Sequence, residues 1–264
     1  MSKVLVIPLS DPVSVEYLYF STIAGCAFIE RLCWISKKAG YQDSVILYND
    51  HSGGLNKSIN HAPGQIHQSL ENASLSEDLT FVFLRQDIFP TVGFLKDVPA
   101  PDKKDTLYLT GEDSPVMVVR VSDISRLSQM LSARSNTISL QETLSKAYPP
   151  VTFDLDNKEY CTVVDHDDIY RVEKNLCLGL IKETDGFMSR HFNRKISLAI
   201  TRQLINTSIT PNKMSLICIA IGVVGGFFLS FPITSLQVFG AFLFLLHSIA
   251  DGCDGELARL KYME

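Results

Sequence analysis

Two aspartates three residues apart, Asp251 and Asp254, follow a long apolar segment near the end of the 264-residue chain. On a helix, positions 251, 254, 255 and 258 share one face, because residues three, four and seven apart lie above one another. That face carries two carboxylates and then Gly255 and Ala258. Carboxylate oxygens suit Mg²⁺ or Mn²⁺, and the two small residues leave room beside the metal. The pattern predicts a site for a metal-bound pyrophosphate; the alternative is a helix end with two solvated acids.

The run 251–259 has the pattern D-x2-D-G-x2-A-R and resembles the first half of the motif of the CDP-alcohol phosphatidyltransferases. These integral membrane enzymes continue the motif as G-x3-D-x3-D, with three metal-binding aspartates and a fourth that acts as general base. The resemblance implies that Asp251 and Asp254 bind metal and that Gly255, Ala258 and Arg259 line the CDP site. We expect the base and at least one further ligand beyond Glu264, so that the chain holds a partial catalytic domain.

Charge and hydropathy divide the chain into two parts. The whole chain carries a net charge of −5, whereas residues 185–264 contain seven Lys and Arg against five Asp and Glu. The acidic part before them is therefore expected to be a soluble domain, residues 1–180. Residues 181–264 are expected to form the first part of a membrane domain.

Two uncharged segments, 214–231 and 233–250, each approach the roughly 20 residues that cross a bilayer. Only a short turn separates them, so both outer ends face the same side of the membrane. Lys and Arg flank those outer ends and are absent from the turn, which by the positive-inside rule places them in the cytoplasm. We expect an integral protein of the cell inner membrane with a cytoplasmic N-terminal domain and active site.

The segment 185–210 mixes apolar and basic residues and is predicted to be a helix lying in the membrane interface. Arg190, Arg194 and Lys195 are candidates for binding the phosphate of an acceptor, because guanidinium groups match phosphate oxygens; anchoring to lipid head groups explains them equally well. Thr210 followed by Pro211 is typical of a helix start. Asn212 is a candidate for contacting the nucleotide, although a role in fixing the helix entry is the favoured alternative. His247, in the second apolar segment, is interpreted as packed and hydrogen-bonded rather than functional.

Residues 1–170 alternate short apolar runs with amphipathic stretches, which predicts an α/β domain. Strands are expected at 3–9, 44–48 and 79–84, and helices at 25–39, 122–133 and 139–148. The segments 24–48, 163–182 and 181–194 resemble the bifunctional inositol-1-phosphate cytidylyltransferase / di-myo-inositol phosphate phosphate synthases. In those enzymes a nucleotidyltransferase domain precedes the membrane domain. The resemblance implies an α/β nucleotidyltransferase-like (Rossmann-like) domain, then an interfacial helix and an α-helical transmembrane hairpin.

One departure bears on activity in the first domain. A triphosphate-binding loop needs glycines and basic residues, because backbone N–H groups must approach the phosphates, yet Ser10 to Glu16 offers neither. Asp87 and Asp165 could hold a metal, but solvated acids at strand ends are an equal reading. We therefore favour a degenerate first domain that does not turn over CTP.

The sequence thus predicts a transferase that moves a phosphoalcohol from a CDP-alcohol donor to an alcohol or inositol phosphate acceptor and releases CMP. The expected cofactor is Mg²⁺ or Mn²⁺, and the expected surroundings are membrane lipids without nucleic acid. A homodimer is the oligomer that the resemblance suggests. Two alternatives stay open: a CTP-dependent sugar or inositol phosphate cytidylyltransferase with a membrane anchor, and a non-catalytic membrane adaptor.

Overall fold

The computed structural model describes residues 2–8, 21–47, 65–67, 79–85, 87–111, 114–132, 140–155, 159–180 and 193–261. The chain forms two compact units. The first comprises Met1–Ser21 and Ala27–Asp168, and the second comprises Thr22–Cys26 and Ile169–Glu264. The main division falls after Asp168, whereas the sequence predicted a boundary after residue 180, and residues 22–26 belong to the second unit.

The first unit is built on a seven-stranded sheet with the order β10-β8-β9-β6-β1-β4-β5. Its strands are β1 (Lys3–Pro8), β4 (Asp43–Leu47), β5 (Gln65–His67), β6 (Thr80–Leu84), β8 (Thr106–Leu109), β9 (Val116–Arg120) and β10 (Pro150–Thr152). Strand β9 runs antiparallel to β6 and β8, and the other neighbouring pairs are parallel. Residues 4–7 of β1 and 81–84 of β6 are continuous apolar runs, as expected of strands buried on both faces. The three predicted strands are confirmed to within one residue at either end.

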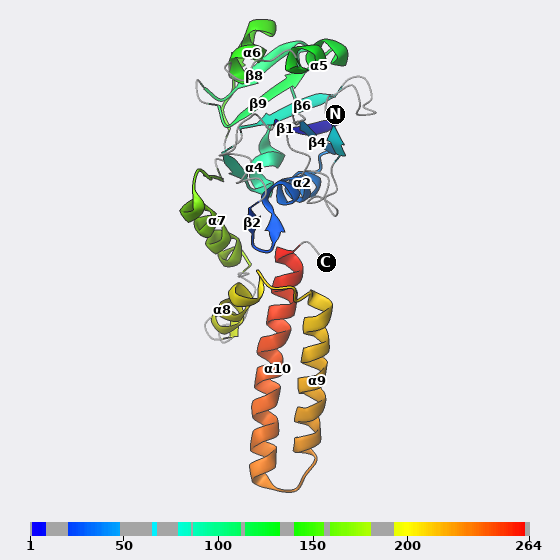
Figure 1. Cartoon of the computed structure of the whole chain (residues 1–264), viewed down its shortest axis with the longest axis vertical. Coiled ribbons are helices and arrows are strands. Elements are labelled where there is room, and N and C mark those ends of the chain that lie inside the picture. Colours follow the sequence, from blue (N-terminus) through cyan, green and yellow to red (C-terminus); the bar gives the residue numbers. More distant parts are fainter. Residues whose placement is uncertain are drawn as a thin grey trace. The chain divides into compact units, whose positions relative to one another are not determined.

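Helices cover both faces of this sheet (Figure 1). Helices α5 (Ile124–Ser132) and α6 (Leu140–Ala147) lie on one face, and α2 (Phe28–Lys38) and α4 (Val92–Asp97) lie on the other. A second, two-stranded sheet pairs β7 (Ile88–Pro90) with β11 (Tyr160–Thr162), which leads into α7 (His166–Leu178). The predicted α/β class is confirmed. The helix expected at 25–39 begins three residues later, because a short hairpin of β2 (Thr22–Ile23) and β3 (Cys26–Ala27) precedes it.

Helix α2 ends in a glycine cap that turns the chain back into the sheet. Gly40 has a φ of +88°, and its N–H donates to the carbonyl of Lys37 at 3.0 Å. The N–H of Tyr41 donates to the carbonyl of Ser36, also at 3.0 Å. These two bonds form a Schellman motif, which satisfies carbonyl groups that the end of a helix leaves without partners.

The second unit contains two long helices, α9 (Pro211–Leu229) and α10 (Thr234–Leu260), and the shorter α8 (Arg194–Leu204). By length and composition, α9 and α10 could each cross a membrane, and only 17% of the most apolar window of each is buried within the structure. The helix start predicted at Thr210 is confirmed: its side chain accepts a hydrogen bond from the N–H of Lys213, and Pro211 occupies the first turn. Helix α8 lies within the predicted segment 185–210, whose residues 185–192 fall outside the described ranges.

A pH-dependent contact links β8 to α5 in the first unit. Asp105 has a φ of +53°, and its carboxylate accepts hydrogen bonds from the side chain and the N–H of Ser122, the latter at 3.0 Å. These bonds lower the pKa of Asp105, because they favour its charged form.

We therefore expect this contact to stabilise the fold above the unfolded-state pKa of Asp105 and to fade as pH falls through the lowered folded-state pKa. In Ser122→Ala the pKa of Asp105 should rise toward its usual value, and thermal stability should fall at neutral pH more than at acid pH. NMR titration of the carboxyl carbon and melting curves at the two pH values measure this. Ser125→Ala, at an exposed position of α5, is the matched control, and equal effects of both variants would contradict the assignment.

Candidate functional site

The acid motif lies in the last turns of α10, which is helical without interruption from Thr234 to Leu260. The predicted common face of residues 251, 254, 255 and 258 is therefore confirmed. Asp251 is exposed at this face, whereas Asp254 and Ala258 are half-buried. The two carboxylates thus lie one helical turn apart on a surface that a ligand can reach.

Helix α9 orients the second of these acids. The hydroxyl of Ser215 donates to Oδ2 of Asp254 at 2.6 Å, so Asp254 has a fixed partner. The two helices also share one buried cluster, in which Met214 and Cys218 of α9 pack against Ala250, Cys253 and Leu257 of α10. Ser215 was not predicted as a site residue, although it is a polar residue near the start of the apolar segment 214–231.

The two glycines of the motif have different surroundings. A Cβ atom added to Gly252 would meet the side chain of Ser197 at 3.4 Å, so Gly252 lets helix α8 approach. A Cβ added to Gly255 would meet nothing within 4 Å among the described residues. Space therefore borders the acids at Gly255, as the motif suggested, while the binding roles of Gly255 and Ala258 stay predictions.

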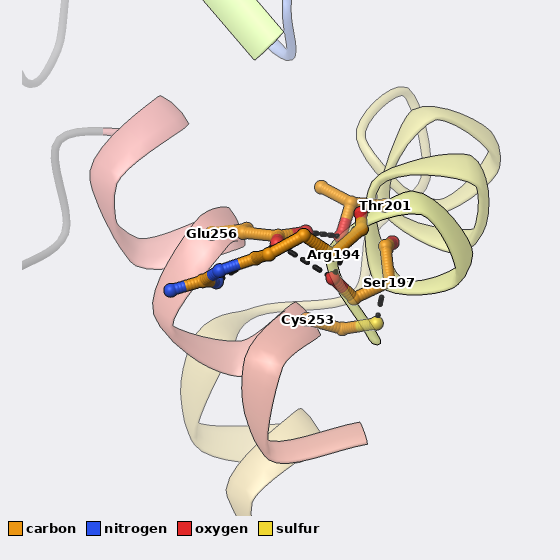
Figure 2. Close-up of polar contacts among 5 residues, drawn as sticks. All are labelled: Arg194, Ser197, Thr201, Cys253 and Glu256. Carbon is orange, nitrogen blue, oxygen red and sulfur yellow. Dashed lines mark hydrogen bonds and ion pairs between the residues drawn. The ribbon is translucent and has the colours of Figure 1, made fainter. Parts of the chain in front are cut away.

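Glu256 lies on the side of α10 that faces α8, away from the acid face, and is fully buried there (Figure 2). Its Oε1 accepts hydrogen bonds from Oγ of Ser197 at 2.7 Å and from Nη1 of Arg194 at 3.0 Å. Its Oε2 accepts a hydrogen bond from Oγ1 of Thr201 at 2.7 Å. The Sγ of Cys253, one turn earlier, donates to the carbonyl of Ser197 at 3.4 Å. A buried carboxylate is costly unless it is paired and hydrogen-bonded, and here both conditions hold.

The remaining predicted ligand-binding residues are only partly placed. Arg194 forms the ion pair with Glu256 and keeps 17% of its side chain exposed. Arg259 is half-buried in the last turn of α10, Asn212 is exposed in the first turn of α9, and Lys195 is exposed on α8. Arg190 lies outside the described residues. Their roles in binding stay predictions.

His247 is packed between the two long helices, as interpreted from the sequence. Its Nδ1 lies 2.9 Å from the carbonyl oxygen of Cys218, which accepts the hydrogen bond. A Cβ on Gly222 would approach the same ring at 3.5 Å. The imidazole therefore joins α9 to α10 at a glycine that allows close contact.

The acid pair fits a divalent metal held jointly with a substrate. No group of three or more His, Cys, Asp or Glu side chains able to hold a metal occurs among the described residues. Two carboxylates, one of them oriented by a hydroxyl, nevertheless suit Mg²⁺, which is often bound through one or two carboxylates together with phosphate oxygens of the substrate. Asp251 and Asp254 offer this donor chemistry.

The two acids singled out in the first unit have structural partners. Asp87 forms a two-pronged ion pair with Arg85, at 2.6 and 2.9 Å. Asp165 accepts a hydrogen bond from the N–H of Asp168 at 2.9 Å, at the start of α7. Asp87 is thus paired with its near neighbour in the chain, and Asp165 caps the start of α7. Residues 10–16, in which a triphosphate-binding loop was sought, lie outside the described ranges.

Comparison with known proteins finds relatives of one description. No family model matches the chain. A protein of Thermococcus kodakarensis named bifunctional IPC transferase and DIPP synthase is 34% identical over 141 residues, which cover 53% of this chain and 31% of that protein. A protein of the same name from Archaeoglobus fulgidus is 37% identical over 125 residues, covering 46% and 24%. The chain thus spans about a third or less of the length of these relatives.

Two solved structures align with part of the chain at low sequence identity. The inositol-1-phosphate CTP transferase of T. maritima aligns with a TM-score of 0.49 and 15% identity, covering 69% of this chain and 98% of that one. A nucleotidyl transferase of Methanothermobacter aligns with a TM-score of 0.47 and 11% identity, covering 66% and 97%.

Proposed function

We propose that the second unit is part of the catalytic domain of a membrane CDP-alcohol phosphotransferase. In this reaction an acceptor hydroxyl attacks the β-phosphorus of a CDP-alcohol, the bond to the CMP oxygen breaks, and CMP leaves. The observation that carries the proposal is the face of α10 where Asp251 and Asp254 border the open space at Gly255. The relatives named IPC transferase and DIPP synthase support an inositol phosphate as the substrate class.

Each residue of this face has a proposed role. Asp251 and Asp254 would hold Mg²⁺ or Mn²⁺, and Ser215 keeps Asp254 in place through its 2.6 Å hydrogen bond. The metal, when bound, would neutralise charge on the diphosphate and on the departing CMP oxygen. Gly255 and Ala258 leave room for the donor, to which Arg259 and Asn212 would contribute contacts. The acceptor phosphate would be bound by Arg190 and Arg194, and no described residue is assigned as the base.

The proposed setting is a membrane, with the site on its cytoplasmic side. Support comes from the two apolar helices and from the Lys and Arg residues that flank their outer ends. CDP-activated substrates are water-soluble at their nucleotide end. A site at the ends of the membrane helices could therefore bind the nucleotide from water and remain in contact with the lipid. Contact with lipids and a homodimer are parts of the same proposal.

Nucleotidyl transfer in the first unit is the competing function. The word transferase in the relatives' name favours it. The ion pair between Arg85 and Asp87 disfavours it, because a metal would have to displace a guanidinium that already holds both carboxylate oxygens. We therefore place nucleotide binding in the second unit; a purely non-catalytic adaptor would bind no CDP there.

Binding of CDP to the full chain in lipid nanodiscs tests this proposal. Calorimetric titration should show binding that requires Mg²⁺ and disappears in EDTA, and Asp87→Asn should leave it unchanged. Binding that survives EDTA, or that is lost in Asp87→Asn, would contradict the assignment to α10.

A further inference from the structure

We propose that Glu256 is a positioning residue: it holds the guanidinium of Arg194 at the edge of the acid face, where Arg194 binds the phosphate of the acceptor. This inference rests on the proposed function of that face. It adds a residue to which the motif gave no role, because Glu256 occupies one of the variable positions between Gly255 and Arg259.

The contacts of Glu256 fix how α8 lies against α10. Arg194, Ser197 and Thr201 are three and four residues apart, so they form a single stripe along α8. All three donate to the same buried carboxylate. Rotation or sliding of α8 would break several of these bonds together, and the carboxylate therefore determines the register of the two helices.

The two hydroxyl groups and the guanidinium contribute differently. Ser197 supplies a short hydrogen bond to Oε1 and Thr201 supplies one to Oε2, so each oxygen has a neutral donor of its own. Arg194 adds the opposite charge at Oε1. Removal of the charge alone should therefore loosen Arg194 while the hydroxyl contacts still hold α8, which makes the two roles separable.

The ion pair with Glu256 brings the guanidinium of Arg194 next to Gly252 of the motif. Figure 2 shows its side chain reaching from α8 across α10, past Glu256. Nη1 lies 4.0 Å from the position that a Cβ of Gly252 would take, so Gly252 leaves room for the guanidinium. On the helix, residues 252 and 259 lie next to Gly255, on the side of the acid face opposite to Asp254. Arg194 thus borders the acid face on the side away from Ser215.

This arrangement suits two phosphate groups of different kinds. The carboxylates would face a metal-bound diphosphate, whereas a planar guanidinium pairs with a phosphate through parallel hydrogen bonds. A guanidinium held by a carboxylate also loses less conformational freedom on binding than a mobile side chain. We therefore assign the acceptor phosphate to Arg194 and its orientation to Glu256.

Glu256→Gln in the full chain, in nanodiscs, tests the assignment with inositol 1-phosphate as the probe. The variant keeps the shape of the side chain but removes its charge, and its amide accepts at the oxygen and donates at the nitrogen, toward which a hydroxyl of Ser197 or Thr201 can turn to accept. Affinity for inositol 1-phosphate should fall about tenfold or more, the usual worth of a hydrogen bond to a charged group, and affinity for CDP with Mg²⁺ should stay as in the wild type. Thr201→Val, which removes one hydroxyl contact and keeps the ion pair, should match the wild type for both ligands.

A folding readout and a double variant complete the experiment. Cys253 is fully buried beneath α8, so its labelling by a maleimide should stay slow in both variants. Arg194→Gln should weaken inositol 1-phosphate binding as much as Glu256→Gln, and the double variant should lose no more than either alone, because both residues act as one unit.

The possible outcomes separate this inference from the proposed function. Unchanged inositol 1-phosphate affinity in Glu256→Gln overturns the positioning role. A parallel loss of both ligands with fast labelling of Cys253 also overturns it, because Glu256 would then only hold α8 in place. Wild-type protein that binds CDP with Mg²⁺ but no inositol 1-phosphate overturns the positioning role alone. Wild-type protein that binds inositol 1-phosphate but no CDP contradicts the proposed function and leaves the positioning role supported.

Discussion

Asp251→Asn and Asp254→Asn should each abolish Mg²⁺-dependent binding of CDP without unfolding the helices. Each change removes one of the two carboxylates on the exposed face of α10 and keeps the size of the side chain. Loss of residues that merely support metal ligands typically costs about 10- to 100-fold in metal affinity, so loss of a ligand should cost at least as much. Calorimetric titration of CDP with Mg²⁺ into the full chain measures the effect.

Controls separate this loss from general effects of charge and folding. Asp254→Asn retains an oxygen that can accept the hydrogen bond of Ser215, so the contact between α9 and α10 should persist and the melting curve should be unchanged. Asp167→Asn, at an exposed position of α7, removes the same charge from a residue with no proposed role in the site, and CDP affinity should stay as in the wild type. The affinity of Ser215→Ala for CDP with Mg²⁺ should lie between those of the wild type and Asp254→Asn, because this change removes the hydrogen bond that orients Asp254 but keeps its carboxylate. Wild-type affinity in both asparagine variants would show that the acids do not hold the metal.

The acid face could be predicted from the sequence because it depends only on local geometry. Residues 251 to 258 lie on one helix, and the spacing of three and four residues is enough to place them on one face. The cap at Thr210 could be predicted for the same reason, since a side chain and an N–H three residues away form it. Features that depend on contacts within a single element are readable from sequence.

The partners of this face could not be predicted, because they depend on the register between helices. The bond from Ser215 to Asp254 spans 39 residues, and the contacts of Glu256 span 55 to 62. One signal was available: Arg194, Ser197 and Thr201 form a polar stripe on a helix whose other positions include apolar residues. Such a stripe indicates a polar partner, but nothing in the sequence identifies Glu256 as that partner.

The hairpin of β2 and β3 was missed for a different reason. Its strands are two residues long, too short for any alternation of polar and apolar residues to reveal them. Its turn is made by Ala24 and Gly25, with φ angles of +51° and +76°. Two positive φ angles are typical of a type I′ turn, but Ala-Gly is not among the pairs that mark one in a sequence. The apolar residues after Gly25 instead suggested an early start of helix α2.

Gly25→Ala, in the second unit, should lower the free energy of unfolding far more than Gly40→Ala does in the first unit. Both glycines have positive φ angles, which cost a residue with a Cβ about 1–2 kcal/mol. A Cβ at Gly40 would meet nothing within 4 Å among the described residues, so Gly40→Ala measures this backbone cost alone. A Cβ at Gly25 would lie 2.4 Å from the carbonyl oxygen of Ile205 and 2.9 Å from Cε of Lys261, far inside van der Waals contact.

Relief of that clash requires the turn to leave its place in the second unit. The N–H of Ala24 donates to Oε1 of Glu173 at 2.8 Å, and Nζ of Lys261 donates to the carbonyls of Thr207 and Ile209, both at 2.9 Å. These bonds should weaken together in Gly25→Ala. Hydrogen exchange of the Ala24 amide should then accelerate in Gly25→Ala and stay unchanged in Gly40→Ala, because exchange reports local opening. Equal losses of stability in the two variants, with protected Ala24 in both, would mean that the turn does not pack against Ile205 as the structure has it.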